Sequence, residues 1–136
     1  MVDASVGAKW WFPETHREAA LRLRSPAHDL HAPELFDLEL CSVVCKRIRR
    51  GEISARDGAR VADLLEEVPI RRHRDRELLR PAMAIAHTTR QTLYDCLYLA
   101  LAVILEARMV TADERFYRAT RSAGAAAHVV WVGDIR

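Results

Sequence analysis

The most apolar segment of the chain reads TLYDCLYLALA from Thr92 to Ala102. Thr92 and Asp95 are three positions apart at its start, which is the spacing of a helix N-cap and its acidic partner. The residues that follow are apolar almost without interruption to Leu105, so the helix expected over residues 92–107 has no polar face. The apolar run is too short to span a bilayer and is typical of a buried core helix. Asp95 therefore lies in the first turn of a helix that the rest of the protein must cover.

Helices and strands are expected to alternate along the rest of the chain. Hydrophobic periodicity and helix-breaking residues predict helices over residues 5–12, 15–24, 76–87 and 113–122. A further helix is expected to have Pro33 in its first turn and to stop at Gly51, and another is expected to open with a Ser54–Asp57 capping box. Strands are expected at residues 1–4, 69–73, 109–112 and 128–132, with a brief extended piece ending at His31. This alternation predicts an α/β fold with a small, mainly parallel sheet of about four or five strands. No internal repeat or linker is evident, so residues 1–136 are expected to form a single domain.

Composition limits the classes of protein to consider. Half of the residues are hydrophobic and 29% are charged, which argues against both disorder and a membrane protein. No basic stretch leads into an apolar segment at the N-terminus, and the three cysteines form no Cys-x-x-Cys pair. A reduced, cytoplasmic location without a membrane partner is therefore expected. The net charge is only +2, so composition permits RNA binding without demonstrating it.

Four acidic residues stand at the ends or edges of the expected elements. Asp3 and Asp113 follow expected strands, Asp95 opens the apolar helix, and Glu39 lies at the edge of the buried face of its helix. Each has an ordinary structural alternative. Asp95 suits a capping box with Thr92, Asp113 stands inside a second such pattern formed by residues 111 and 114, Asp3 suits a turn, and Glu39 suits a solvated helix face.

The four carboxylates together indicate more than each does alone. Carboxylates that are brought together repel one another and raise each other's pKa values unless a cation neutralises them. A set of oxygen ligands suits a hard cation such as Mg²⁺ or Mn²⁺. Such an ion could activate water and stabilise the departing oxygen of a phosphodiester.

Four segments of the chain resemble the motifs of the PIN-domain family, in particular the VapC-type toxins. They read VDASV from Val2, APELFDLE from Ala32, TLYDCLYLALA from Thr92 and TADERF from Thr111, and their acidic positions are Asp3, Glu39, Asp95 and Asp113. The motifs appear in order and extend over essentially the whole chain. Two positions depart from the family pattern: Cys96 replaces the usual alanine, and Ser42 stands where asparagine is common.

The resemblance implies a three-layer α/β/α fold in which the four acids converge on one or two Mg²⁺ or Mn²⁺ ions and catalyse RNA cleavage. It implies that Ser5, Thr92 and Thr111 orient these carboxylates or close helix caps. It also implies a structured RNA substrate such as tRNA or ribosomal RNA, homodimerisation, and inhibition by a VapB-type antitoxin. Arg115, two residues beyond Asp113, is the leading candidate for a contact with the RNA phosphate.

Two alternatives accompany this interpretation. Because only two residues precede Asp3, the first strand is short, and the acidic pocket could belong to an impaired nuclease that binds RNA or an antitoxin without cleaving. A receiver-type signalling domain would also hold Mg²⁺ in an acidic pocket. It would need a second acid beside the first and a late lysine, but Ala4 follows Asp3 and no lysine follows Lys46.

Overall fold

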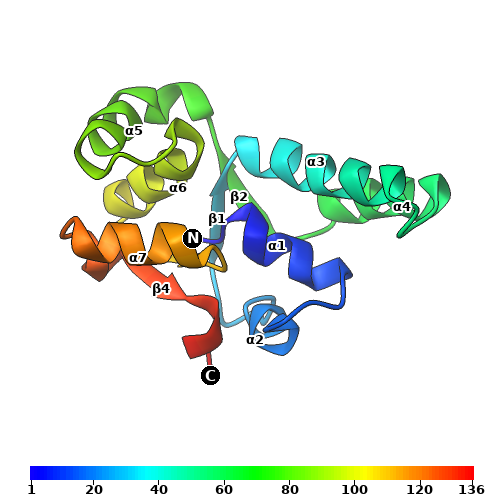
Figure 1. Cartoon of the computed structure of the whole chain (residues 1–136). Helices are drawn as coiled ribbons and strands as arrows, with labels where there is room; N and C mark the ends of the chain where they lie inside the picture. The colour runs from blue at the N-terminus through cyan, green and yellow to red at the C-terminus, as the bar shows by residue number, and fades with distance from the viewer.

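The computed structural model describes residues 1–136 and contains seven α-helices and two pairs of short parallel strands (Figure 1). The elements are α1 (Ala4–Trp11), α2 (Arg17–Arg22), β1 (Leu30–Pro33), α3 (Leu35–Arg49), α4 (Ala55–Glu66), β2 (Ile70–His73), α5 (Asp75–Thr89), α6 (Leu93–Ile104), β3 (Met109–Thr111), α7 (Glu114–Ser122) and β4 (Val129–Trp131). No helix combines the length and the apolar character needed to cross a membrane.

The N-terminal segment joins the two strand pairs. β1 pairs with β2 and β3 pairs with β4, each in parallel. Val2 forms a parallel bridge with Val110 of β3, and its N–H donates to the carbonyl of His31 in β1 at 3.1 Å. The strands therefore follow the order β2, β1, the Val2 segment, β3, β4. This arrangement confirms the expected α/β class with a small parallel sheet.

The first strand is reduced to a single bridging residue because Asp3 directs the chain into a helix. Its carboxylate accepts the N–H of Val6 at 3.0 Å, and its carbonyl accepts the N–H of Gly7 at 3.0 Å. These bonds satisfy donors of the first turn, so α1 begins at Ala4. The predicted strand over residues 1–4 is thus wrong in length.

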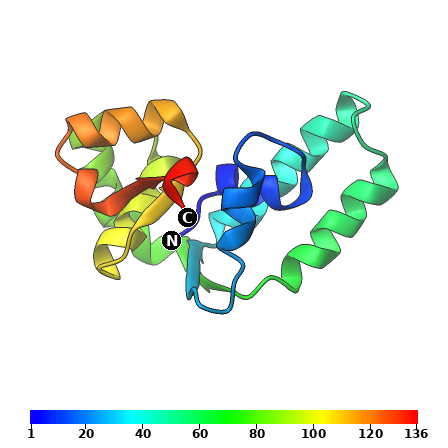
Figure 2. The same ribbon diagram turned by 90° about the horizontal axis from the view of Figure 1, so that it is seen from below.

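Two groups of helices lie on either side of the strands, as Figures 1 and 2 show. Helices α5, α6 and α7 lie on one side, and α1, α2, α3 and α4 lie on the other. The centre of the core is α6, in which every residue from Cys96 to Ala102 is buried. On the other side α1 packs closely on α3. Gly7 permits this approach, because a Cβ atom at this position would lie 2.6 Å from Cζ of Phe36.

Several predicted boundaries are wrong, for local reasons. Pro33 is the last residue of β1 and does not open α3; the first turn of α3 instead receives the Asp75 carboxylate, which accepts the N–H of Leu35 at 3.1 Å. The helix expected over residues 15–24 covers only Arg17–Arg22, because His16 adopts a left-handed conformation. α6 ends at Ile104, two residues before Glu106, which has a positive φ.

Candidate functional site

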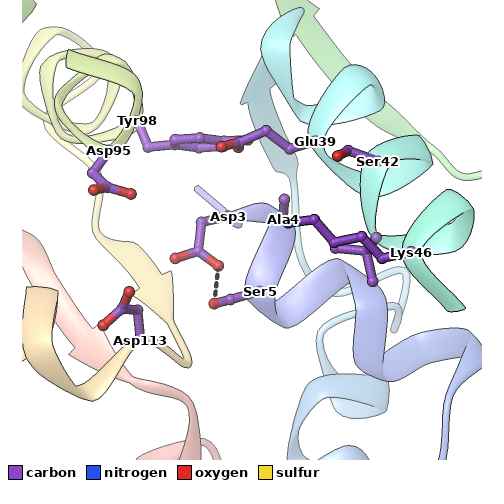
Figure 3. A pocket seen from close by; sticks show the side chains of 10 residues that line it. Asp3, Ala4, Ser5, Glu39, Ser42, Lys46, Asp95, Tyr98 and Asp113 are labelled. Carbon is purple, nitrogen blue, oxygen red and sulfur yellow. Dashed lines mark hydrogen bonds between the residues drawn. The ribbon is translucent and has the colours of Figure 1, made fainter. Parts of the chain in front are cut away.

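One cavity of about 290 Å³ is lined by all four acidic residues that the sequence singled out (Figure 3). Its lining consists of Asp3, Ala4, Ser5, Glu39, Ser42, Val43, Lys46, Asp95, Tyr98 and Asp113. Figure 3 shows that the carboxylates come from four parts of the chain: Asp95 from α6, Glu39 from α3, Asp3 from the segment before α1 and Asp113 from the segment before α7. Residues separated by more than a hundred positions in sequence therefore meet in one polar cavity.

Ser5 connects the first and the last of the four motifs. Its hydroxyl donates to Oδ1 of Asp3 and accepts the backbone N–H of Ala112 at 2.9 Å. Asp3 is almost fully buried, with 7% of its surface exposed, so the hydroxyl determines how a buried carboxylate is oriented. Ser5 also ties the start of α1 to the residue before Asp113. This contact agrees with the orienting role that the resemblance implied for Ser5.

Asp95 serves both as a helix cap and as a cavity residue. The Thr92 hydroxyl donates to its Oδ2 at 2.6 Å and accepts its backbone N–H at 3.1 Å, which is the capping box expected from sequence. Its other carboxylate oxygen, Oδ1, has no hydrogen bond to the protein. The structural role therefore leaves one oxygen of Asp95 available to a ligand.

Asp113 itself caps α7, and the capping pattern expected from Thr111 and Glu114 is wrong. Oδ1 of Asp113 accepts the N–H of Phe116 at 3.0 Å, while the Thr111 hydroxyl accepts the N–H of Asp113 at 3.0 Å. Thr111 is completely buried, and its hydroxyl also acts to lower the pKa of Asp3. It therefore influences both Asp3 and Asp113.

Glu39 is held by a residue to which the sequence assigned no role. The Tyr98 hydroxyl donates to its Oε2 at 2.6 Å and thereby joins α6 to α3 across the cavity. Tyr98 is only 2% exposed, and burial together with the Glu39 carboxylate raises the pKa of its hydroxyl, so Tyr98 stays protonated and acts as a donor. Its position one turn after Asp95, on the same face of α6, was the available clue.

The carboxylates perturb one another electrostatically. Burial raises the pKa of Asp3 to about 6, hydrogen bonds from Ser5, Thr111 and Val6 oppose the rise, and the Glu39 carboxylate adds to it. Burial also raises the pKa of Glu39, and Asp95 adds to this rise. The pKa of Asp95 is likewise raised, first by burial and then by Asp113. Asp3, Glu39 and Asp95 therefore belong to one coupled group that disfavours their simultaneous ionisation.

This donor set fits a hard divalent cation. No three of the acidic, histidine or cysteine side chains lie close enough to hold one ion jointly. Mg²⁺ typically takes only one or two carboxylates and completes its shell with water, so the wider spacing is compatible with that ion. A cation would also offset the mutual repulsion that raises the pKa values of Asp3, Glu39 and Asp95.

Some further polar and charged residues line the cavity and others lie outside it. Lys46 and Ser42 line it, whereas Arg115 is exposed on the first turn of α7 and does not. Lys46 was not predicted to belong to the site, although it follows Glu39 by seven positions, a spacing that places both on one face of α3. Asp75 lies outside the lining, but its charge contributes to the raised pKa of Glu39.

Comparison with known proteins identifies the family. The model of the PIN domain matches residues 1–122. A relative named "Ribonuclease VapC3" from Pyrobaculum aerophilum is 32% identical over 117 residues, which cover 85% of this chain and 89% of the relative. A relative with the same name from Mycobacterium tuberculosis strain H37Rv is 34% identical over 125 residues, covering 92% and 90%. Together with the four-motif cavity, these matches show that the chain belongs to the PIN-domain family.

Proposed function

We propose that this protein is a metal-dependent endoribonuclease and the toxin component of a VapBC-type toxin–antitoxin system, built as a single PIN domain over residues 1–136. The observation that carries the proposal is the gathering of Asp3, Glu39, Asp95 and Asp113 around one cavity. The names of the relatives, which are ribonucleases of the VapC type, support RNA as the substrate and a VapB-type antitoxin as the partner.

The four acids would hold one or two Mg²⁺ or Mn²⁺ ions, with at most two carboxylates in direct contact with each ion and water completing its shell. A bound ion of this kind supplies Lewis-acid stabilisation of the phosphate and lowers the pKa of water. Ser5 and Tyr98 keep Asp3 and Glu39 in fixed orientations through the hydrogen bonds described above, so that these carboxylates need little reorganisation. We expect products with 5′-phosphate and 3′-hydroxyl ends.

The capping roles of the acids do not conflict with this chemistry. In Glu39, Asp95 and Asp113, one carboxylate oxygen carries the structural hydrogen bond and the other has none to the protein. An ion bound to these free oxygens would leave intact the caps that Asp95 and Asp113 provide and the bond between Tyr98 and Glu39. Arg115, exposed near Asp113, remains our candidate for a more distant phosphate contact.

Exposed apolar side chains on α3, α5 and α6 support the proposal that this protein binds protein partners. These side chains are Leu38, Leu79, Met83, Tyr94, Val103 and Ile104. Exposed apolar side chains favour protein–protein contact where they are neighbours, as Leu79 and Met83 are at four positions apart on α5. We therefore propose that this protein forms a homodimer and binds an antitoxin, which analytical ultracentrifugation of the protein with and without a co-expressed antitoxin would test.

A matched pair of substitutions separates catalysis from helix capping. Asp57 forms with Ser54 the same capping box that Asp95 forms with Thr92, at 2.7 Å and 3.0 Å, but it lies on α4 outside the cavity. Asp95→Asn should abolish RNA cleavage while the protein stays folded, and Asp57→Asn should leave cleavage intact. Cleavage of total RNA with Mg²⁺, with Mn²⁺ and with EDTA gives the readout.

The outcomes also decide the alternative of an impaired nuclease. If the wild-type protein binds RNA or an antitoxin but leaves RNA intact with either metal, the binding role is correct and the catalytic one is wrong. If folded Asp95→Asn protein still cleaves RNA, the assignment of the acidic cavity is wrong.

A further inference from the structure

Lys46 is the only basic side chain among the residues that line the acidic cavity. It stands on α3 seven positions after Glu39, with Ser42 and Val43 between them on the same lining face. Two helical turns place Lys46 about 10 Å along the helix axis from Glu39. Figure 3 shows it across the cavity from Asp95 and Asp113. The lysine therefore lies beside the carboxylates without being surrounded by them.

Two nearby cations, Arg47 and Lys9, are neutralised within the protein, but Lys46 is not. Arg47, the next residue, forms ion pairs with Glu14 and Glu52, and its guanidinium stacks over the ring of Phe12 at 4.3 Å. Lys9 is buried and paired with Glu14 at 3.1 Å. Lys46 forms no ion pair and no hydrogen bond, although it is turned toward a cavity with four acids. Its charge is thus available to an anion that enters the cavity.

An RNA strand needs such a charge here. A phosphodiester that approaches four carboxylates meets repulsion, and phosphate contacts from lysine and arginine supply much of the affinity of proteins for nucleic acids. The separation along α3 is more than the reach of one phosphate group, so a strand whose scissile phosphate lies among the acids would carry a neighbouring phosphate toward Lys46.

We propose, on the basis of the function proposed above, that Lys46 binds the RNA phosphate next to the one that is cleaved. This contact positions the strand before and during cleavage alike. It therefore contributes uniform binding, which lowers KM and leaves kcat nearly unchanged. One released counterion per phosphate contact also contributes about 0.7 to the slope of log K against log salt concentration for a single strand.

Three variants test the proposal in cleavage and binding assays. Lys46→Gln removes the charge, Lys46→Arg retains it, and Arg49→Gln removes an exposed charge from the same helix outside the cavity. We expect Lys46→Gln to raise KM about tenfold with kcat changed less than twofold, Lys46→Arg to restore KM, and Arg49→Gln to resemble the wild type. In an Asp95→Asn background, binding of a single-stranded RNA measured by fluorescence anisotropy should lose about 0.7 of its salt slope when Lys46→Gln is added.

The results separate this inference from the function on which it rests. If the wild type cleaves RNA and Lys46→Gln leaves both KM and the salt slope unchanged, the role of Lys46 is wrong and the nuclease assignment stands. If the wild type does not cleave RNA, the nuclease assignment is wrong, and the anisotropy arm decides the Lys46 contact alone. A tenfold loss in kcat at unchanged KM would also overturn the proposal, because it would place Lys46 at the cleaved phosphate itself.

Discussion

Burial of the Asp3 carboxylate makes its charge costly to the folded protein, and Asp3→Asn measures that cost. The pKa of this group is raised from 3.8 to about 6 in the folded protein. A difference of about two pKa units corresponds to about 3 kcal/mol of unfolding free energy. Asparagine keeps an oxygen that can accept the N–H of Val6 in the helix cap, and it carries no charge.

Stability falls with rising pH because the unfolded chain releases the Asp3 proton at a lower pH than the folded protein does. Below about pH 4 the Asp3 carboxyl is protonated in both states, and the folded protein bears no penalty. Between about pH 4 and pH 6 the unfolded chain ionises while the folded chain still holds its proton, so the free energy of unfolding falls as pH rises. Above this window the penalty is complete and constant. Asp3→Asn removes it.

Without metal, Asp3→Asn should therefore be more stable than the wild type by about 3 kcal/mol at pH 8, and the advantage should vanish near pH 4. At about 2.1 cal/mol/K of unfolding entropy per residue, a chain of 136 residues gains about 10 °C in Tm from this difference. The raised pKa values of Glu39 and Asp95 affect both proteins, so the comparison largely isolates Asp3.

Thermal unfolding followed by circular dichroism in EDTA, at intervals from pH 4 to pH 8, provides the measurement. A Tm difference that is independent of pH would show that the substitution acts through packing and not through charge. A wild type that is the more stable protein at pH 8 would refute the reasoning about burial.

Three further predictions concern the same region. Tyr98→Phe removes the donor 2.6 Å from Glu39 and should lower the free energy of unfolding, measured by chemical denaturation, by about 1–2 kcal/mol. It should also raise the pKa of Glu39 and so move the acidic limb of the pH–rate profile to higher pH; an unchanged profile would contradict this. Gly7→Ala places a Cβ atom 2.6 Å from Cζ of Phe36 and should cost about 1–3 kcal/mol, whereas equal stability would show that α1 and α3 can separate. Mn²⁺ should raise the Tm of the wild type but hardly that of Asp3→Asn, and equal shifts would place the ion elsewhere.

Local interactions explain most of what sequence analysis predicted about the fold. The buried helix α6 and its Thr92–Asp95 cap depend on residues three or four positions apart, and both are present. The order of helices and strands likewise follows from local periodicity. The errors arose where a distant group decided the local structure, as when the Asp75 carboxylate received the N–H of Leu35 and Pro33 ended a strand.

The identity and order of Asp3, Glu39, Asp95 and Asp113 could be read from the sequence, because each stands beside an element that its own neighbours encode. That the four line one cavity, with Tyr98 as the donor to Glu39 from 59 positions away, depends on how the helices and strands pack in three dimensions. The same packing leaves Lys46 facing that cavity unpaired while Arg47 is neutralised by acids. The physical reason is that helix caps and periodicity act over one turn, whereas burial, charge coupling and cross-helix hydrogen bonds arise only when distant elements pack together.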